Sequence, residues 1–223
     1  MEVKKLSRYE LGILGGMGPL ATVKLYERIV NKTKASCDQE HIEMVILNKC
    51  SIPDRTLALT ANGADPLPYL NEGIEELILL GCKYFCIPCN TAHAYKSKFK
   101  NLDKIEFIDM IEEAKKFLKE LDKDIYVFCT NGTRKVDVYS ASFLKYPDIS
   151  MQDDIMQIVT DTKAGLDCFD RLYGFIKKVN KPVLLACTEF SIYYDRLLKC
   201  SDIEVYDAMD ILVNKIIEKC QSK

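Results

Sequence analysis

The sequence predicts an α/β protein of two pseudo-symmetric lobes, each a mostly parallel sheet flanked by helices. Short apolar runs alternate with amphipathic helical stretches along the 223 residues, and this alternation is typical of parallel strands joined by helices. The chain is 48% hydrophobic, which is enough for two lobes of about 100 residues each. The second half also repeats the order of elements in the first half, so we expect the two lobes to be related.

The first half contains four expected strands and the helices that follow them. The strands are buried apolar runs at residues 11–14, 43–47, 84–88 and 105–108. The helices are amphipathic stretches at residues 19–31, 67–81, 91–99 and 111–121. Pro19 suits the first turn of its helix, and Gly81 suits the end of the second helix.

The second half shows the same alternation. Its expected strands are residues 125–129, 149–151, 183–186 and 203–206, of which 149–151 is the shortest. Its expected helices are residues 134–144, 154–179, 189–198 and 208–220, the longest being interrupted near Gly165. We assign residues 1–103 plus 206–223 to the first lobe and residues 104–205 to the second.

The internal repeat places two cysteines at equivalent points. Cys89 lies sixteen residues before Ile105, in Ile-Glu-Phe-Ile-Asp-Met, and Cys187 lies sixteen residues before Ile203, in Ile-Glu-Val-Tyr-Asp-Ala-Met. Each cysteine follows an expected strand. Because ligands of open α/β sheets bind at the carboxyl ends of strands, both cysteines are candidates for a functional site.

Composition and charge argue against several classes of partner. The net charge is −2 and no long basic block occurs, so we expect neither nucleic acid nor an anionic membrane as a partner. Residues 11–20 form a poor signal peptide because four glycines and Pro19 interrupt them. No apolar stretch reaches the roughly 18 residues of a membrane span. The ten cysteines therefore indicate reduced thiols in a cytoplasmic protein.

Two cysteines at strand ends can perform acid–base chemistry. The unpaired N–H groups at the start of a helix stabilise a thiolate. If the lobes face each other, Cys89 and Cys187 approach a bound molecule from opposite sides. One sulfur then removes a proton while the other delivers a proton to the far face, which inverts a stereocentre. The alternative is that both are ordinary buried core cysteines.

Four motifs follow one another along the chain: Gly15-Gly16-Met17-Gly18-Pro19-Leu20-Ala21-Thr22, Ile52-Pro53-Asp54-Arg55-Thr56, Pro88-Cys89-Asn90-Thr91-Ala92-His93 and Ala186-Cys187-Thr188-Glu189. Together they resemble the aspartate/glutamate racemase family, most closely its aspartate racemase branch, from about residue 10 to 210. The resemblance implies racemisation of a small acidic amino acid, aspartate before glutamate, without a cofactor. It also implies an active site in the cleft between the lobes, and a homodimer.

The resemblance assigns roles to individual residues. Cys89 and Cys187 match the two catalytic bases, and Asn90, Thr91 and Thr188 match positions that hold the substrate α-carboxylate and amine. The other expected substrate-binding residues are Arg55 and Lys163, near the side-chain carboxylate, Thr130 and Thr133, in the second-lobe loop, and Met17, Asn48 and Glu189. Ala186 departs from the family, in which glycine is common before the second cysteine.

Other interpretations of the same residues stay open at this point. The chain could be another thiol-based member of the superfamily, acting on a dicarboxylate or hydantoin as an isomerase or decarboxylase. Cys86 and Cys89 form a C-x-x-C motif typical of thiol–disulfide redox proteins, and Cys82 and His93 extend it to a zinc-binding spacing. The glycines at residues 15–18 also match part of a dinucleotide fingerprint, although Asn48 stands where an acidic residue is expected.

Overall fold

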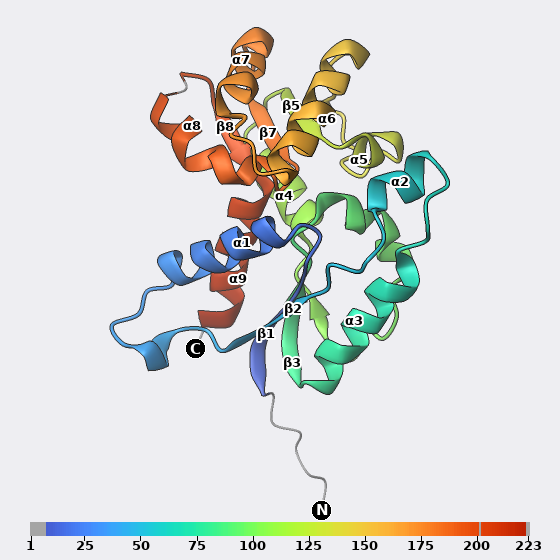
Figure 1. Cartoon of the computed structure of the whole chain (residues 1–223). Helices are drawn as coiled ribbons and strands as arrows, with labels where there is room; N and C mark the ends of the chain where they lie inside the picture. The colour runs from blue at the N-terminus through green and yellow to red at the C-terminus, as the bar shows by residue number, and fades with distance from the viewer. Residues whose placement is uncertain (1–7, 201, 222–223) are drawn as a thin grey trace, which may run out of the picture.

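The computed structural model describes residues 8–200 and 202–221 and contains two four-stranded sheets, one in each lobe (Figure 1). The strand order is β2-β1-β3-β4 in the first sheet and β6-β5-β7-β8 in the second. All neighbouring strands in both sheets are parallel. The predicted fold class is therefore confirmed, and the identical order of strands shows that the lobes are related.

The strands are short, as expected for sheets covered by helices on both faces. The first sheet contains β1 (Tyr9–Gly15), β2 (Met44–Asn48), β3 (Cys82–Cys86) and β4 (Glu106–Phe107). The second sheet contains β5 (Ile125–Cys129), β6 (Leu144–Lys145), β7 (Val183–Ala186) and β8 (Val205–Asp207).

Helices connect these strands. In the first lobe they are α1 (Pro19–Lys32), α2 (Arg55–Thr60), α3 (Leu67–Leu79) and the 3-10 helices η1 (Asp38–Glu40) and η2 (Asn90–Lys98). The later helices are α4 (Met110–Lys119), α5 (Asn131–Lys135), α6 (Ile149–Lys163), α7 (Phe169–Val179), η3 (Phe190–Tyr193), α8 (Tyr194–Cys200) and α9 (Ala208–Gln221).

The prediction of a strand at residues 149–151 is wrong. These residues form the first turn of α6, because the Asp148 carboxylate accepts a hydrogen bond from the Met151 amide at 2.8 Å and so caps the helix. The strand of this region is β6, which pairs with β5. The helix expected at 134–144 is also wrong in extent, since α5 ends at Lys135.

Of three further helical segments, one agrees with the prediction and two differ from it in detail. The stretch 154–179 is divided into α6 and α7, as expected, and Gly165 between them has a φ of +87°. Residues 91–99 form a 3-10 helix rather than an α-helix. Helix α2 was not expected; it begins at Asp54, whose carboxylate accepts from the Leu57 amide at 2.8 Å.

Strand pairing places two elements differently from the lobe boundaries that we expected. Strand β4 pairs with β3 in the first sheet, although the boundary after residue 103 would assign it to the second lobe. Strand β8 pairs with β7, so Tyr206 and Asp207 belong to the second sheet. The division of the chain into two units at residues 103 and 206 stays a prediction.

A single hydrophobic cluster joins the two lobes. It contains one face of each sheet, represented by Ile13 of β1 and Val127 of β5, together with the buried faces of α1, α4 and α9. Helix α9, the red helix in Figure 1, packs against both α1 and α4. Two further clusters cover the other face of each sheet separately. The orientation of the lobes therefore depends on a core that both share.

A buried ion pair strengthens this junction. Arg28 of α1 pairs with Asp207 at the end of β8, and both side chains are almost fully buried. Arg28 also donates to the Ser191 carbonyl at 2.7 Å, and the Ser191 hydroxyl donates to Asp207 at 2.7 Å. Burial disfavours the Arg28 charge, but the carboxylates around it outweigh this effect and raise the pKa of Arg28. The network ties α1 to the segment that follows β7.

No helix among residues 8–200 and 202–221 is long and apolar enough to span a membrane. The ten cysteines, all of which lie within these residues, are free thiols.

We predict that Arg28→Met lowers the free energy of unfolding by about 3–5 kcal/mol, because it leaves the buried Asp207 carboxylate without its charged partner. Chemical denaturation measures this change. The control is Lys123→Met, which breaks the exposed 2.6 Å pair with Glu204 and should cost less than about 1 kcal/mol. Equal losses in the two variants would show that the buried pair does not stabilise the lobe junction.

Candidate active site

A narrow cavity of about 20 Å³ lies between the lobes, at the carboxyl ends of the strands. Its lining residues come from both lobes: Met17, Asp54, Arg55, Thr56, Cys89, Asn90, Thr91, Thr130, Lys163, Cys187, Thr188 and Glu189. Ten of these are residues that the sequence singled out. The two cysteines, which are 98 positions apart in the chain, thus reach the same small space.

The repeated topology explains why the cysteines meet. Cys89 follows β3 and precedes η2, and Cys187 follows β7 and precedes η3. Strands β3 and β7 occupy equivalent places in their sheets, so the two sulfurs extend from equivalent loops. Cys89 is 6% exposed and Cys187 is 3% exposed, and both therefore act in a largely water-free environment.

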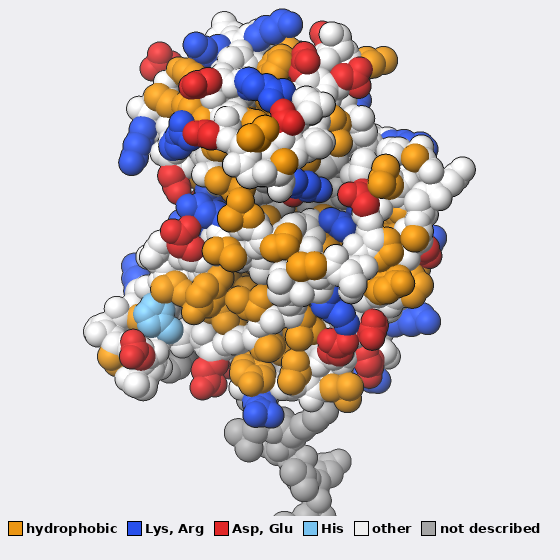
Figure 2. Space-filling model, viewed as in Figure 1, with side chains coloured by type: hydrophobic (Ala, Val, Ile, Leu, Met, Phe, Trp, Pro, Cys, Tyr) orange, Lys and Arg blue, Asp and Glu red, His pale blue; other side chains and the backbone are white. Residues whose placement is uncertain are grey.

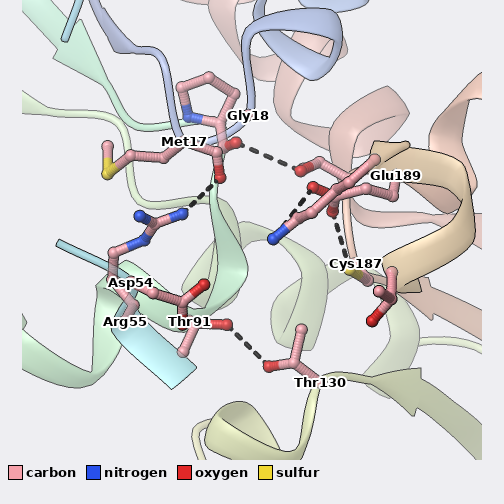
Figure 3. Close-up of polar contacts among 12 residues, drawn as sticks. Met17, Gly18, Asp54, Arg55, Thr91, Thr130, Cys187 and Glu189 are labelled. Carbon is pink, nitrogen blue, oxygen red and sulfur yellow. Dashed lines mark hydrogen bonds and ion pairs between the residues drawn. The ribbon is translucent and has the colours of Figure 1, made fainter. Parts of the chain in front are cut away.

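Cys187 is held next to a carboxylate. Its thiol donates a hydrogen bond to Oε2 of Glu189 at 2.9 Å (Figure 3). The other oxygen, Oε1, lies 3.7 Å from the Lys163 ammonium. Burial and the negative charge of Glu189 raise the pKa of Cys187 well above its ordinary value. Cys187 is therefore a protonated thiol at neutral pH.

Cys89 faces a cation instead. The guanidinium of Arg55, a residue that is 8% exposed, lines the same cavity as Cys89 and is close enough for the two groups to interact electrostatically. It is held there by the carbonyls of Met17 at 2.8 Å and Pro53 at 3.1 Å. Burial opposes the Arg55 charge, but Cys89 and the nearby carboxylates outweigh it and raise the pKa of Arg55. Arg55 is thus a fixed positive charge suited to stabilising a thiolate on Cys89.

Lys163 is the more exposed of the two predicted basic residues. Its side chain is 41% exposed, and Glu189 is the acidic group paired with it. Burial opposes its charge, but Glu189 and the two cysteine sulfurs raise the pKa of Lys163. Unlike Arg55, Lys163 is not bound to backbone carbonyls by any hydrogen bond found among the described residues, so its ammonium can turn toward a ligand.

Three threonine hydroxyls connect the lobes beside the cysteines. Thr91 of the first lobe lies 2.8 Å from Thr130 and 3.0 Å from Thr133 of the second (Figure 3 labels Thr91 and Thr130). Thr133 is fully buried behind the cavity and does not line it. Gly132 allows the close approach, since a Cβ at this position would lie 2.9 Å from the Thr91 methyl group. Thr133 therefore supports the site from behind.

Thr188 and Asn90 complete the polar lining. The Thr188 hydroxyl donates to the Pro88 carbonyl at 3.3 Å, which links the two cysteine loops directly. Asn90 is 3% exposed and lines the cavity next to Cys89. Amide and hydroxyl groups of this kind are suited to binding a carboxylate.

Asn48, which we expected to bind substrate, does not lie in the cavity. Asn48 is exposed at the end of β2, does not line the cavity, and donates to the Cys50 sulfur at 3.4 Å. Strand β2 is an edge strand of its sheet, and the cavity is lined by the segment that follows it, at Asp54, Arg55 and Thr56, rather than by the last residue of the strand. Sequence reasoning instead missed Asp54 and Thr56, which line the cavity next to Arg55. Both could have been identified from the sequence, because they belong to the motif at residues 52–56.

A wider chamber of about 330 Å³ opens beside the narrow cavity. The two spaces share Met17, Asp54, Arg55, Lys163 and Glu189, and the chamber is continued by residues of the β1–α1 loop and by Ile192. Figure 2 shows this side of the molecule, where the surface narrows between the upper and lower lobes and basic side chains lie in the hollow. Ligands can therefore approach the cysteines through the chamber.

The glycine-rich β1–α1 loop forms a tight turn with an internal hydrogen bond. Gly16 has a φ of +89°, and a Cβ there would lie 2.6 Å from the Lys49 backbone, so only glycine fits. The Gly16 amide donates to the Thr22 hydroxyl at 3.0 Å. This amide is therefore already paired, which weakens the dinucleotide interpretation. No cluster of His, Cys, Asp and Glu within the described residues is arranged to hold a metal ion.

Comparisons with known proteins agree with this geometry. A family model described as Asp/Glu/hydantoin racemase matches residues 14–216. The structure of an aspartate racemase from Picrophilus torridus is 30% identical, with a TM-score of 0.82 over 94% of this chain and 93% of that chain. The broad-specificity amino-acid racemase RacX of Bacillus subtilis is 23% identical over 93% of this chain and 96% of that protein.

A more distant structure shares the fold. The glutamate racemase from Francisella tularensis, solved in complex with D-glutamate, is 13% identical and has a TM-score of 0.61 over 96% of this chain and 81% of that chain.

We predict that Glu189→Gln lowers the pKa of Cys187, because it removes the negative charge that opposes the thiolate. At pH 8 the variant should alkylate at Cys187 several-fold faster than the unchanged protein, as measured by peptide mapping after treatment with iodoacetamide. The control is Asp54→Asn, which removes another carboxylate of the cavity that has no hydrogen bond to Cys187. An unchanged rate at Cys187 in Glu189→Gln would contradict the assigned cause.

Proposed function

The chain belongs to the Asp/Glu/hydantoin racemase family, and on this premise we propose that it racemises an acidic amino acid by a two-base mechanism. Aspartate is the first expected substrate and glutamate the second, with Cys89 and Cys187 as the bases and no cofactor. The relatives are amino-acid racemases, which are isomerases, so this protein is an isomerase of the same kind. The observation that carries the mechanism is that two cysteines from opposite lobes line one cavity.

The different partners of the two sulfurs support opposite starting states. A two-base racemase needs one sulfur deprotonated and the other protonated before each turnover. The positive charge of Arg55 lies beside Cys89, whereas burial and Glu189 raise the pKa of Cys187, so we assign the starting thiolate to Cys89 and the starting thiol to Cys187. In this state Cys89 removes the α-proton from one face of the substrate while Cys187 donates its proton to the opposite face. Turnover leaves Cys89 as the thiol and Cys187 as the thiolate, which is the starting state for the reverse reaction.

The α-proton of an amino acid is weakly acidic, so the site must stabilise the carbanion. We assign this role to the polar lining, because Asn90, Thr91 and Thr188 can hold the α-carboxylate onto which the negative charge spreads. The low exposure of both cysteines strengthens these interactions, since little water competes for them. Lys163, at the junction with the outer chamber, is assigned to the substrate's side-chain carboxylate.

The remaining alternatives have less support. A one-way isomerase or decarboxylase needs a single thiol, whereas here both cysteines reach the cavity. For redox chemistry Cys86 would have to pair with Cys89. Cys86 instead packs in the core cluster shared by the lobes, and Cys89 packs in the cluster on the other face of the first sheet. Burial also raises the pKa of Cys86 far above its ordinary value.

Two further expectations stay predictions. The ten free thiols fit a reducing compartment, and we propose that the enzyme works in the cytoplasm. We also keep the homodimer that the family resemblance implies.

We predict that the protein exchanges the α-proton of L-aspartate for deuterium in D₂O without added cofactor, with parallel loss of optical activity. Cys89→Ala or Cys187→Ala should lower the racemisation rate by about 10²–10⁴-fold, because each removes one proton-transfer group. Cys86→Ala, which changes a buried thiol outside the cavity, should retain activity. Unchanged proton spectra and optical rotation for both aspartate and glutamate would rule out the proposed function.

We predict that Lys163→Met raises KM for aspartate and glutamate about tenfold or more, because a charge-assisted contact with the substrate side chain is lost. The same change should have little effect on any activity toward alanine, which lacks this carboxylate. Steady-state kinetics with the three amino acids measures the difference. Lys178→Met on α7, outside both cavities, is the matched control. An equal loss for aspartate and alanine would contradict the assignment.

A further inference from the structure

Two residues that line the cavity, Arg55 and Asn90, each have a buried side-chain nitrogen without a hydrogen-bond partner among the described residues. The Nδ2 atom of Asn90 is buried and donates to no acceptor among the described residues, although Asn90 itself lines the cavity. A buried amide donor without a partner is costly in a folded protein unless a ligand or water supplies the acceptor. Nδ2 is therefore a donor held ready for a group that enters the cavity.

The opposite end of the same amide is held by a tyrosine. The Tyr139 hydroxyl donates to Oδ1 of Asn90 at 2.5 Å. Tyr139 is fully buried in the core cluster shared by the lobes, in the segment between α5 and β6. Burial raises the pKa of Tyr139 well above its ordinary value, so the hydroxyl keeps the proton that it donates. The contact runs from the second lobe to the first.

The tyrosine also determines which way the amide faces. If the Asn90 amide were turned over, Nδ2 would donate to the Tyr139 oxygen, and the tyrosine proton would then lack an acceptor. Oδ1 would face the cavity, where it would repel a carboxylate rather than bind it. The observed arrangement is the one that satisfies the buried hydroxyl and leaves Nδ2 as an unpartnered donor on a residue that lines the cavity.

We propose that Tyr139 is a positioning residue that orients the Asn90 amide, so that Nδ2 donates to the α-carboxylate of the bound amino acid. This inference rests on the proposed function for the identity of the ligand. Tyr139 does not touch the cavity and acts only through Asn90. It adds a residue from the shared core to those that determine substrate binding.

A double-mutant cycle tests the proposal. Tyr139→Phe should lower kcat/KM for aspartate about tenfold, which corresponds to one lost hydrogen bond. In the Asn90→Ala background the same change should alter kcat/KM less than twofold, because the group on which Tyr139 acts is absent. A tenfold loss that persists in the Asn90→Ala background would overturn the proposal and assign the effect to packing. Tyr146→Phe, which removes an exposed hydroxyl bonded to Asp137 at 2.9 Å, is the control and should leave kcat/KM unchanged.

Asn90→Asp provides a second test that leaves Tyr139 intact. Aspartate keeps the oxygen that accepts from Tyr139 but replaces the donor nitrogen with a second acceptor. Its kcat/KM should fall at least as far as in Asn90→Ala. Activity close to that of the unchanged protein would overturn the proposal, because the donor would then be unnecessary.

A readout without turnover separates this inference from the proposed function. The side-chain amide signal of Asn90 in a ¹⁵N NMR spectrum is assigned by its loss in Asn90→Ala. In Tyr139→Phe this signal should shift and broaden, because the amide is free to turn over, whereas Tyr146→Phe should leave it in place. An identical signal in Tyr139→Phe would overturn the positioning role. Absence of racemisation in the unchanged protein would instead overturn the proposed function.

Discussion

The site depends on holding two separate sheets at a fixed distance from each other. In the mechanism that we propose, two sulfurs act on opposite faces of one carbon, and a displacement of either by about an ångström would impair the reaction. The fold meets this requirement with a core that belongs to both lobes, formed by α1, α4 and α9 against one face of each sheet. The Arg28–Asp207 pair and the Thr91–Thr130 contact also connect the lobes, and the hydrogen bond from Thr188 to the Pro88 carbonyl links the two cysteine loops. The small size of the cavity follows from this tight junction.

The two lobes repeat each other in topology but differ in charge beside the sulfurs. The residue two positions after Cys89 is Thr91, and the residue two positions after Cys187 is Glu189. One loop therefore places a neutral hydroxyl near its cysteine, and the other places a carboxylate at 2.9 Å. The first lobe adds Arg55 from a separate segment. An almost symmetric fold thus places a cation beside one cysteine and a carboxylate beside the other, and this difference in charge underlies the mechanism that we propose.

The features that could be predicted from the sequence are those encoded locally or by repetition. The alternation of apolar runs and helices predicted the fold, and the matched spacing around Cys89 and Cys187 predicted their equivalence. The strand expected at 149–151 failed because the apolar residues there are the buried face of a helix, and only the Asp148 cap distinguishes the two. The placement of Asn48 in the site was wrong because the end of a strand does not by itself reveal that β2 lies at the edge of the sheet.

Other features depend on long-range contacts that no local pattern contains. Tyr139 is 49 positions from Asn90, and its role arises only when the lobes have assembled. The contrast between Arg55 and Lys163 also depends on long-range contacts, because the family resemblance describes both simply as basic residues near the substrate. Only the three-dimensional arrangement distinguishes the guanidinium that is fixed by backbone carbonyls from the ammonium that remains accessible.

The shared core also has a consequence for the order in which the chain folds. Helix α9 follows all eight strands in the chain, yet its residues Met209, Leu212 and Ile216 fill the cluster between the sheets. During synthesis each sheet can form as its own strands emerge, but the surface between them stays open to water until α9 has left the ribosome. The lobes are therefore expected to mature together once α9 has been synthesised and to unfold as one cooperative unit, although they look like two domains.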